Sequence, residues 1–140
     1  MKTVLKNLGG TAFGVAVYLG LVQIALLFVA TMLAGHAASE VAAAISLPFI
    51  VLMLVSGAIS GLLVGAVHSI ARLSPALGSY AIAAMLVSFA LLCVSYATDA
   101  TTAVNLGVVI STLVSGAITG VCAGLGVRTV NALGARMARR

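Results

Sequence analysis

The sequence predicts an all-α integral membrane protein, in which four transmembrane helices form one bundle built from two tandem hairpins of the same orientation. Three observations predict this fold class: an apolar composition, four long apolar runs and an internal repeat at an offset of 59 residues. Of the 140 residues, 63% are hydrophobic and 6% are charged, whereas a soluble domain carries about 25% charged residues. So little polar surface does not cover a water-soluble fold, and the bilayer is the expected solvent.

The four apolar runs are each long enough to cross a bilayer as a helix, which takes about 20 residues. The first expected helix covers residues 11–34, and its apolar run is about twice as long as the core of a signal peptide. The other three are expected over residues 44–71, 77–97 and 103–127. Because the connections are short, consecutive helices should be antiparallel, and residues 1–140 should form a single membrane domain.

The charges divide cleanly between the two sides of this topology. All seven cations fall on the side of the two termini: Lys2, Lys6, Arg72, Arg128, Arg136, Arg139 and Arg140. This asymmetry predicts cytoplasmic termini, and we expect a bacterial cytoplasmic (inner) membrane, with a mitochondrial inner membrane as the alternative. The net charge of +5 should therefore meet anionic lipid headgroups rather than nucleic acid. The basic segment 128–140 is expected to be a short interfacial helix or a frayed tail.

An internal repeat joins the second and fourth apolar runs. The stretch LVSGAISG at 54–61 recurs as LVSGAITG at 113–120. The same offset relates Glu40 to Asp99, which are the only acidic residues. We expect both at helix N-termini, where the helix dipole favours a carboxylate. The repeat predicts hairpins over about 11–71 and 77–127, related by a pseudo-two-fold axis along the membrane normal.

Each copy of the repeat places three glycines four residues apart, along one face of a helix. Such faces let two helices approach closely, which is a main source of attraction between helices in lipid. We expect the two faces to meet each other at the pseudo-two-fold axis; the alternative is that they face a partner protein. The expected packing residues are Gly57, Gly61, Gly65, Gly116, Gly120 and Gly124.

Few polar side chains lie within the predicted spans, and no Asp, Glu, Lys or Arg lies near their midplane. A transport site based on carboxylates is therefore not expected. Gln23, near the centre of the first helix, should form an interhelical hydrogen bond or line a path. The hydroxyl pairs beside the glycines offer the same two roles, and they are Ser56, Ser60, Ser115 and Thr119.

No arrangement of residues indicates catalysis, a cofactor or a metal site. His36 and His68 fall on opposite sides of the predicted membrane, and both are expected at its interfaces. Cys93 and Cys122 should differ in depth by about 15–20 Å, which excludes a disulfide. Pro48, matched by Gly107 at the offset of 59, is expected to cause a mild kink, with a discontinuous binding helix as the alternative.

These observations predict a non-catalytic membrane subunit, not an enzyme. It would pack through its glycine and small-residue faces into a homo-oligomer or a larger membrane protein complex. The alternative is a small channel or transporter, with a path between the hairpins or through an oligomer.

Overall fold

The computed structural model describes residues 2–35, 39, 46–98 and 105–139. Four long helical segments make up this part of the chain. The first is continuous and has three parts, and the elements in order are α1 (Lys2–Gly14), the π-helical turn η1 (Val15–Leu19), α2 (Gly20–Leu33), α4 (Leu47–Ile70), α5 (Leu77–Thr98) and α6 (Leu106–Met137). All four segments are long and apolar enough to cross a membrane, which confirms the four apolar helices of the predicted fold class.

Two of the helical segments extend well beyond the apolar runs. The first begins at Lys2 rather than near residue 11, and α6 ends at Met137 rather than near residue 127. Hydropathy marks only the apolar part of a helix, whereas backbone hydrogen bonds continue through polar residues that favour helices. Arg136 lies in the last turn of α6, where a cation is favoured by the helix dipole. The basic segment after residue 127 is thus a direct continuation of α6.

The starts of α4 and α6 lie at equivalent positions of the repeat. Ser46 and Asn105 occupy the N-cap positions with extended backbones, and the Asn105 side chain accepts a hydrogen bond from the Val108 N–H. Pro48 lies in the first turn of α4, where its missing N–H interrupts no helical hydrogen bond. It therefore starts the helix and causes no kink.

Two acidic residues precede α4 and α6 in the sequence. Glu40 and Asp99, expected at helix N-termini, lie outside the described residues. Neither α4 nor α6 has an acidic residue in its first turn.

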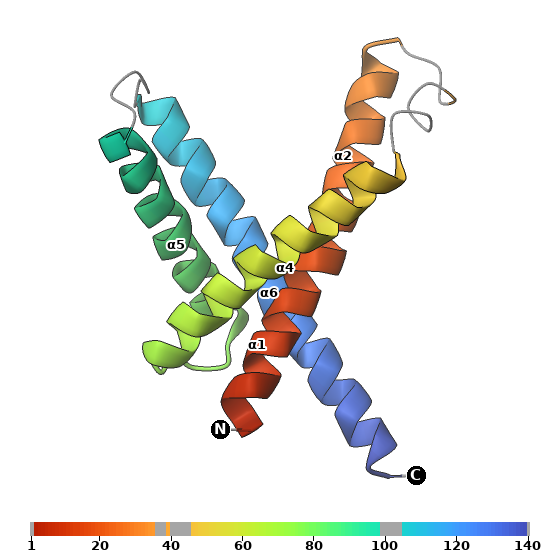
Figure 1. Cartoon of the computed structure of the whole chain (residues 1–140), viewed down its shortest axis with the longest axis vertical. Coiled ribbons are helices and arrows are strands. Elements are labelled where there is room, and N and C mark those ends of the chain that lie inside the picture. Colours follow the sequence, from red (N-terminus) through yellow and green to blue (C-terminus); the bar gives the residue numbers. More distant parts are fainter. Residues whose placement is uncertain (1, 36–38, 40–45, 99–104, 140) are drawn as a thin grey trace.

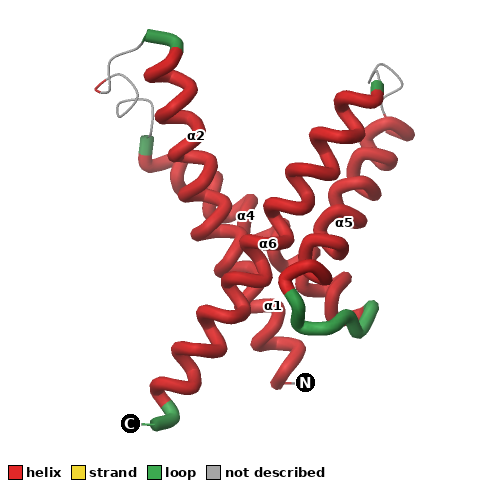
Figure 2. The backbone as a smooth tube through the Cα atoms, turned by 180° about the vertical axis from the view of Figure 1, so that it is seen from behind, coloured by secondary structure: helices red, strands yellow, loops and turns green. Residues whose placement is uncertain are grey.

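The helices are arranged as two arms that cross (Figure 1). One arm pairs α2 with the first half of α4, and the other pairs α5 with the first half of α6. We call the end with both termini and the α4–α5 turn the basal end, and the opposite end, where the arms diverge, the distal end. Figure 2 shows the same divergence from behind. Each helix therefore contacts its neighbours over only part of its length.

The buried core is small and lies where the arms cross. It consists of small and medium-sized side chains, together with one aromatic ring: Val15, Val64, Tyr80, Ala83, Ala84, Ala123 and Val127. Toward the distal end the apolar side chains are exposed, as Leu33 and Leu91 illustrate. In each candidate span, no more than 22% of the residues in its apolar 18-residue stretch are buried within the chain. Most of the apolar surface is thus left for lipid or another protein to cover.

Candidate functional site

The glycine face of α4 packs against the first helical segment. A Cβ atom added to Gly61 would lie 2.7 Å from Cα of Ala12, and one added to Gly57 would lie 2.9 Å from Cα of Ala16. Both distances are shorter than Cβ contacts in real proteins. Only glycine therefore allows the backbones of α4 and the first helical segment to approach this closely.

The glycine face of α6 packs against α5 in the same way. A Cβ atom on Gly120 would lie 2.5 Å from Cα of Ala81, and one on Gly116 would lie 3.0 Å from Cα of Met85. One on Gly124 would lie 3.0 Å from the Tyr80 ring. Each glycine face thus packs on the helix that precedes it in the chain.

This packing differs from both arrangements expected from the sequence. The two glycine faces neither meet each other nor point outward at a partner protein. The physical reason is that each face finds a complementary small-residue surface nearby in the sequence, around Ala12 and Ala16 on the first segment and around Ala81 on α5. A short connection brings antiparallel neighbours together at the lowest entropic cost.

A third glycine contact joins α1 to α6 and holds the two arms together. A Cβ atom on Gly14 would lie 2.8 Å from Cα of Gly126, and one on Gly10 would lie 2.8 Å from Cα of Val127. The sequence reasoning missed this contact, although Gly10 and Gly14 have the same spacing of four residues as the repeated stripes. We call this contact, formed by Gly10, Gly14, Gly126 and Val127, the waist.

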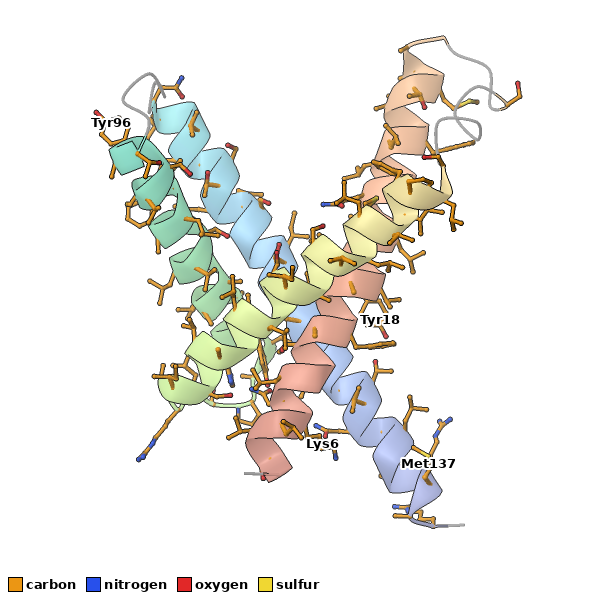
Figure 3. All side chains as sticks on the ribbon, viewed as in Figure 1. Lys6, Tyr18, Tyr96 and Met137 are labelled. Carbon is orange, nitrogen blue, oxygen red and sulfur yellow. The ribbon has the colours of Figure 1, made fainter. Side chains whose placement is uncertain are left out.

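A hydrogen bond between side chains reinforces the waist. The Tyr18 hydroxyl, in η1, lies 2.8 Å from Oγ1 of Thr129 in α6. Figure 3 shows Tyr18 beside α6, between the crossing point and the basal end. Since 111 residues separate this pair in the chain, the bond fixes the arms relative to each other and not merely a local turn.

The polar side chains singled out from the sequence line two small cavities toward the distal end. Gln23, Ser56 and Ser60 border a cavity of about 100 Å³ between η1, α2 and α4. Ser60, Ser115 and Thr119 border one of about 240 Å³ where the arms begin to diverge. The hydroxyls of Ser56 and Thr119 bond to carbonyls of their own helices, at Met53 and Ser115. Apolar side chains complete the lining of both cavities, and the described hydrogen bonds of these two hydroxyls join no helices.

A partly buried polar cluster lies at the basal end, and the sequence reasoning did not find it. The Tyr80 hydroxyl donates to Oδ1 of Asn7 at 2.6 Å, and Nδ2 of Asn7 donates to Oγ of Ser69 at 2.9 Å. These bonds join α5, α1 and α4 in one chain of donors and acceptors. Asn7 precedes the span expected from the sequence, and only the early start of α1 brings it into contact with α4 and α5.

His68, at the basal end of α4, belongs to the same cluster. Its side chain is 5% exposed, and its ring stacks on Tyr80 with centroids 3.8 Å apart. Its Nε2 lies 3.0 Å from the Ser74 carbonyl oxygen, which requires a proton on Nε2 because a carbonyl only accepts. The imidazole thus ties the end of α4 to the turn before α5.

The remaining reactive side chains show no convergent chemistry. Cys93 is exposed and Cys122 is buried at the waist, and both are free thiols. Among the residues that the structure describes, no group of three His, Cys, Asp or Glu residues is placed to hold a metal ion. His36 lies outside the described residues.

No protein-family model, curated protein or solved structure matches this chain.

Proposed function

We propose that this protein crosses a bilayer four times with its basal end in the cytoplasm, in a bacterial cytoplasmic membrane. The four apolar helices support the spans. The termini and the α4–α5 turn share one end (Figure 1), and these segments carry most of the chain's cations. Such an imbalance favours the cytoplasmic side. Reporter fusions at the C-terminus and in the α5–α6 connection test this: cytoplasmic activity at the connection and not at the C-terminus contradicts the orientation.

We also infer that the two arms arose as a duplicated hairpin. The glycines of the two faces correspond at an offset of 59 residues, as Gly61 and Gly120 do. The residues that they contact correspond at an offset of 69 residues, as Ala12 and Ala81 do. Gly61 lies against Ala12 just as Gly120 lies against Ala81. The same contact recurs in both hairpins, which supports a parallel repeat whose two copies have connections of different length.

The function that this geometry supports best is that of a non-catalytic membrane subunit. The observation that carries the proposal is the sparse internal burial: at most 22% of the residues in the apolar 18-residue stretch of each span are buried within the chain. The divergence of the arms leaves both inner faces without a neighbouring helix at the distal end (Figure 1). A homo-oligomer or a larger membrane complex would cover these faces.

Purification in mild detergent tests this proposal. We expect stoichiometric association with further copies or with other membrane proteins, measured by light scattering and mass spectrometry. A lone monomer in detergent, and in nanodiscs at several protein-to-lipid ratios, would contradict it.

A small channel or transporter is the second candidate. It is favoured by the cavity of about 240 Å³ between the arms, which is lined by four hydroxyl side chains: Ser60, Ser88, Ser115 and Thr119. Reconstitution of the chain alone in liposomes, followed by ion and small-solute flux, tests this candidate. If the protein is correctly inserted and no ion or small solute of a broad panel crosses the membrane, the channel or transporter function is refuted.

A further inference from the structure

The basal end holds a cavity of about 410 Å³ that the proposed function leaves unused. This basal pocket lies between α1, the end of α4, the α4–α5 turn, α5 and α6. Its volume falls within the range of about 300–1,000 Å³ typical of small-molecule sites. Its polar lining side chains include Lys6, Asn7, Ser69, Arg72 and Asn131. A ligand there would contact both arms.

The charge of the basal pocket is positive and has no acidic counterpart. Lys6 and Arg72 both line it. The chain contains two acidic residues, Glu40 and Asp99, and both lie outside the described residues. None of the pocket's lining residues is acidic, so an anion is the ligand that would neutralise it.

The backbone at Arg72 gives a second, independent sign of function. Arg72 follows the C-terminus of α4 with φ of 49°, and the Arg72 and Leu73 N–H groups bond back to the Ser69 and His68 carbonyls. Glycine is the residue that usually occupies this left-handed position. The equivalent position after α2 is indeed Gly35, with φ of 82°. An arginine in this conformation is strained, and such strain is concentrated at ligand sites.

The pocket also offers hydrogen-bond donors held in fixed positions. Ser69 Oγ accepts from Asn7, and Asn7 in turn accepts from Tyr80. The Ser69 hydroxyl proton is therefore free to point toward a ligand oxygen. Because Asn7 is held by both Ser69 and Tyr80, its remaining amide hydrogen has a defined direction as well. Donors ordered beside two cations suit the oxygens of a phosphate group.

We propose that the basal pocket binds the phosphate group of an anionic phospholipid, with Lys6 and Arg72 contacting the phosphate. This inference rests on the proposed membrane orientation. Val4, Leu73 and Val127 supply apolar walls beside the charges, and Leu5 and Ile70 are exposed on the adjoining helix surfaces. Acyl chains would therefore lie along the spans while the headgroup enters the pocket. Basic pockets between transmembrane helices on the cytoplasmic side commonly hold anionic headgroups.

Binding by the purified, delipidated full chain in detergent tests this proposal. Native mass spectrometry would measure the affinity for short-chain phosphatidylglycerol, for phosphatidylcholine and for inorganic phosphate. We expect phosphatidylglycerol to bind most tightly. Loss of either cation should weaken it about fivefold, since a basic residue near an anionic lipid contributes about 1 kcal/mol. The two variants are Lys6→Gln and Arg72→Gly.

The choice of Arg72→Gly separates binding from folding. Glycine fits the left-handed backbone, so this variant should be at least as stable as the original chain while it binds lipid more weakly. Arg139→Gln removes one cation outside the pocket and should leave affinity unchanged.

Three results would overturn the proposal. Equal losses for Arg139→Gln and the pocket variants would indicate diffuse surface charge. Equal affinity for phosphatidylglycerol and phosphatidylcholine would show that the pocket does not select an anionic headgroup. Tight binding of inorganic phosphate would indicate a soluble ligand. If the reporter fusions show cytoplasmic termini and the lipid-binding test fails, only the proposed binding site is refuted. If the reporter fusions instead place the distal end in the cytoplasm, the proposed orientation is refuted.

Discussion

Replacing Gly14 by alanine gives the sharpest test of the waist. Gly14 has helical φ and ψ of −61° and −47°, so alanine fits its backbone. The new Cβ, however, would lie 2.8 Å from Cα of Gly126 and 2.9 Å from its nitrogen, both of which are backbone atoms. Carbon atoms at optimal separation are about 3.5–4.0 Å apart. The two helices would therefore have to separate by about 1 Å, which places the cost in the range of overpacked cores, about 1–3 kcal/mol.

Gly9→Ala is the matched control, because a Cβ at Gly9 meets no atom within 4 Å. Both substitutions are in α1, so the gain in helix propensity of about 1 kcal/mol is common to both and cancels in the comparison. Unfolding in mixed micelles, followed by circular dichroism, should show a free energy of unfolding lower by about 1–3 kcal/mol for Gly14→Ala than for Gly9→Ala. Equal stability of the two variants would refute the close approach of α1 and α6.

Three further predictions follow from the packing and the polar cluster. Gly120→Ala should destabilise the chain by about 1–3 kcal/mol in the same assay, while Gly134→Ala should not, because its Cβ would meet only the flexible Lys6 Nζ at 3.6 Å; similar effects of the two would contradict the α5–α6 contact. Tyr80→Phe removes the 2.6 Å bond to Asn7 and should cost about 0.5–1.5 kcal/mol, whereas Tyr96→Phe, at an exposed position of the same helix, should be neutral. A maleimide that partitions into micelles should label exposed Cys93 and spare buried Cys122 until the protein is unfolded. Mass spectrometry of the labelled peptides measures this, and labelling of Cys122 before Cys93 would contradict the packing.

The four helical spans could be predicted from the sequence because lipid leaves the backbone few alternatives. A segment within the hydrocarbon must satisfy every N–H and C=O internally, so an apolar run of sufficient length becomes a helix. The basal ends of α1 and α6 were harder to predict, since no apolar run marks residues such as Asn7 or Arg136 as helical. The early start of α1 then determines the basal cluster, because Asn7 meets Ser69 and Tyr80 only if α1 extends that far.

The partner of each glycine face could not be predicted from spacing alone. A stripe such as Gly57, Gly61 and Gly65 shows that another backbone approaches, but it does not identify that backbone. The complementary surfaces, around Ala12 and Ala81, resemble any other apolar stretch of helix. Which surface is used depends on the order of the helices along the chain, and the waist depends on Gly126, which lies outside the repeated pattern.

The pairing of the first helical segment with the last has a consequence for synthesis. Tyr18 and Thr129 are 111 residues apart, and a ribosome adding about 5–20 residues per second needs about 6–20 s to make that stretch. During this interval the glycine face of α1 that includes Gly10 and Gly14 is in the membrane without α6 to cover it. Each hairpin can close as soon as its second helix emerges, and α5 can contact α1 and α4 before α6 is made, but α1 and α6 cannot pack together until α6 is complete. The waist is therefore among the last contacts that the nascent chain can make, and a nascent chain arrested before α6 would expose these glycines to other helices in the membrane.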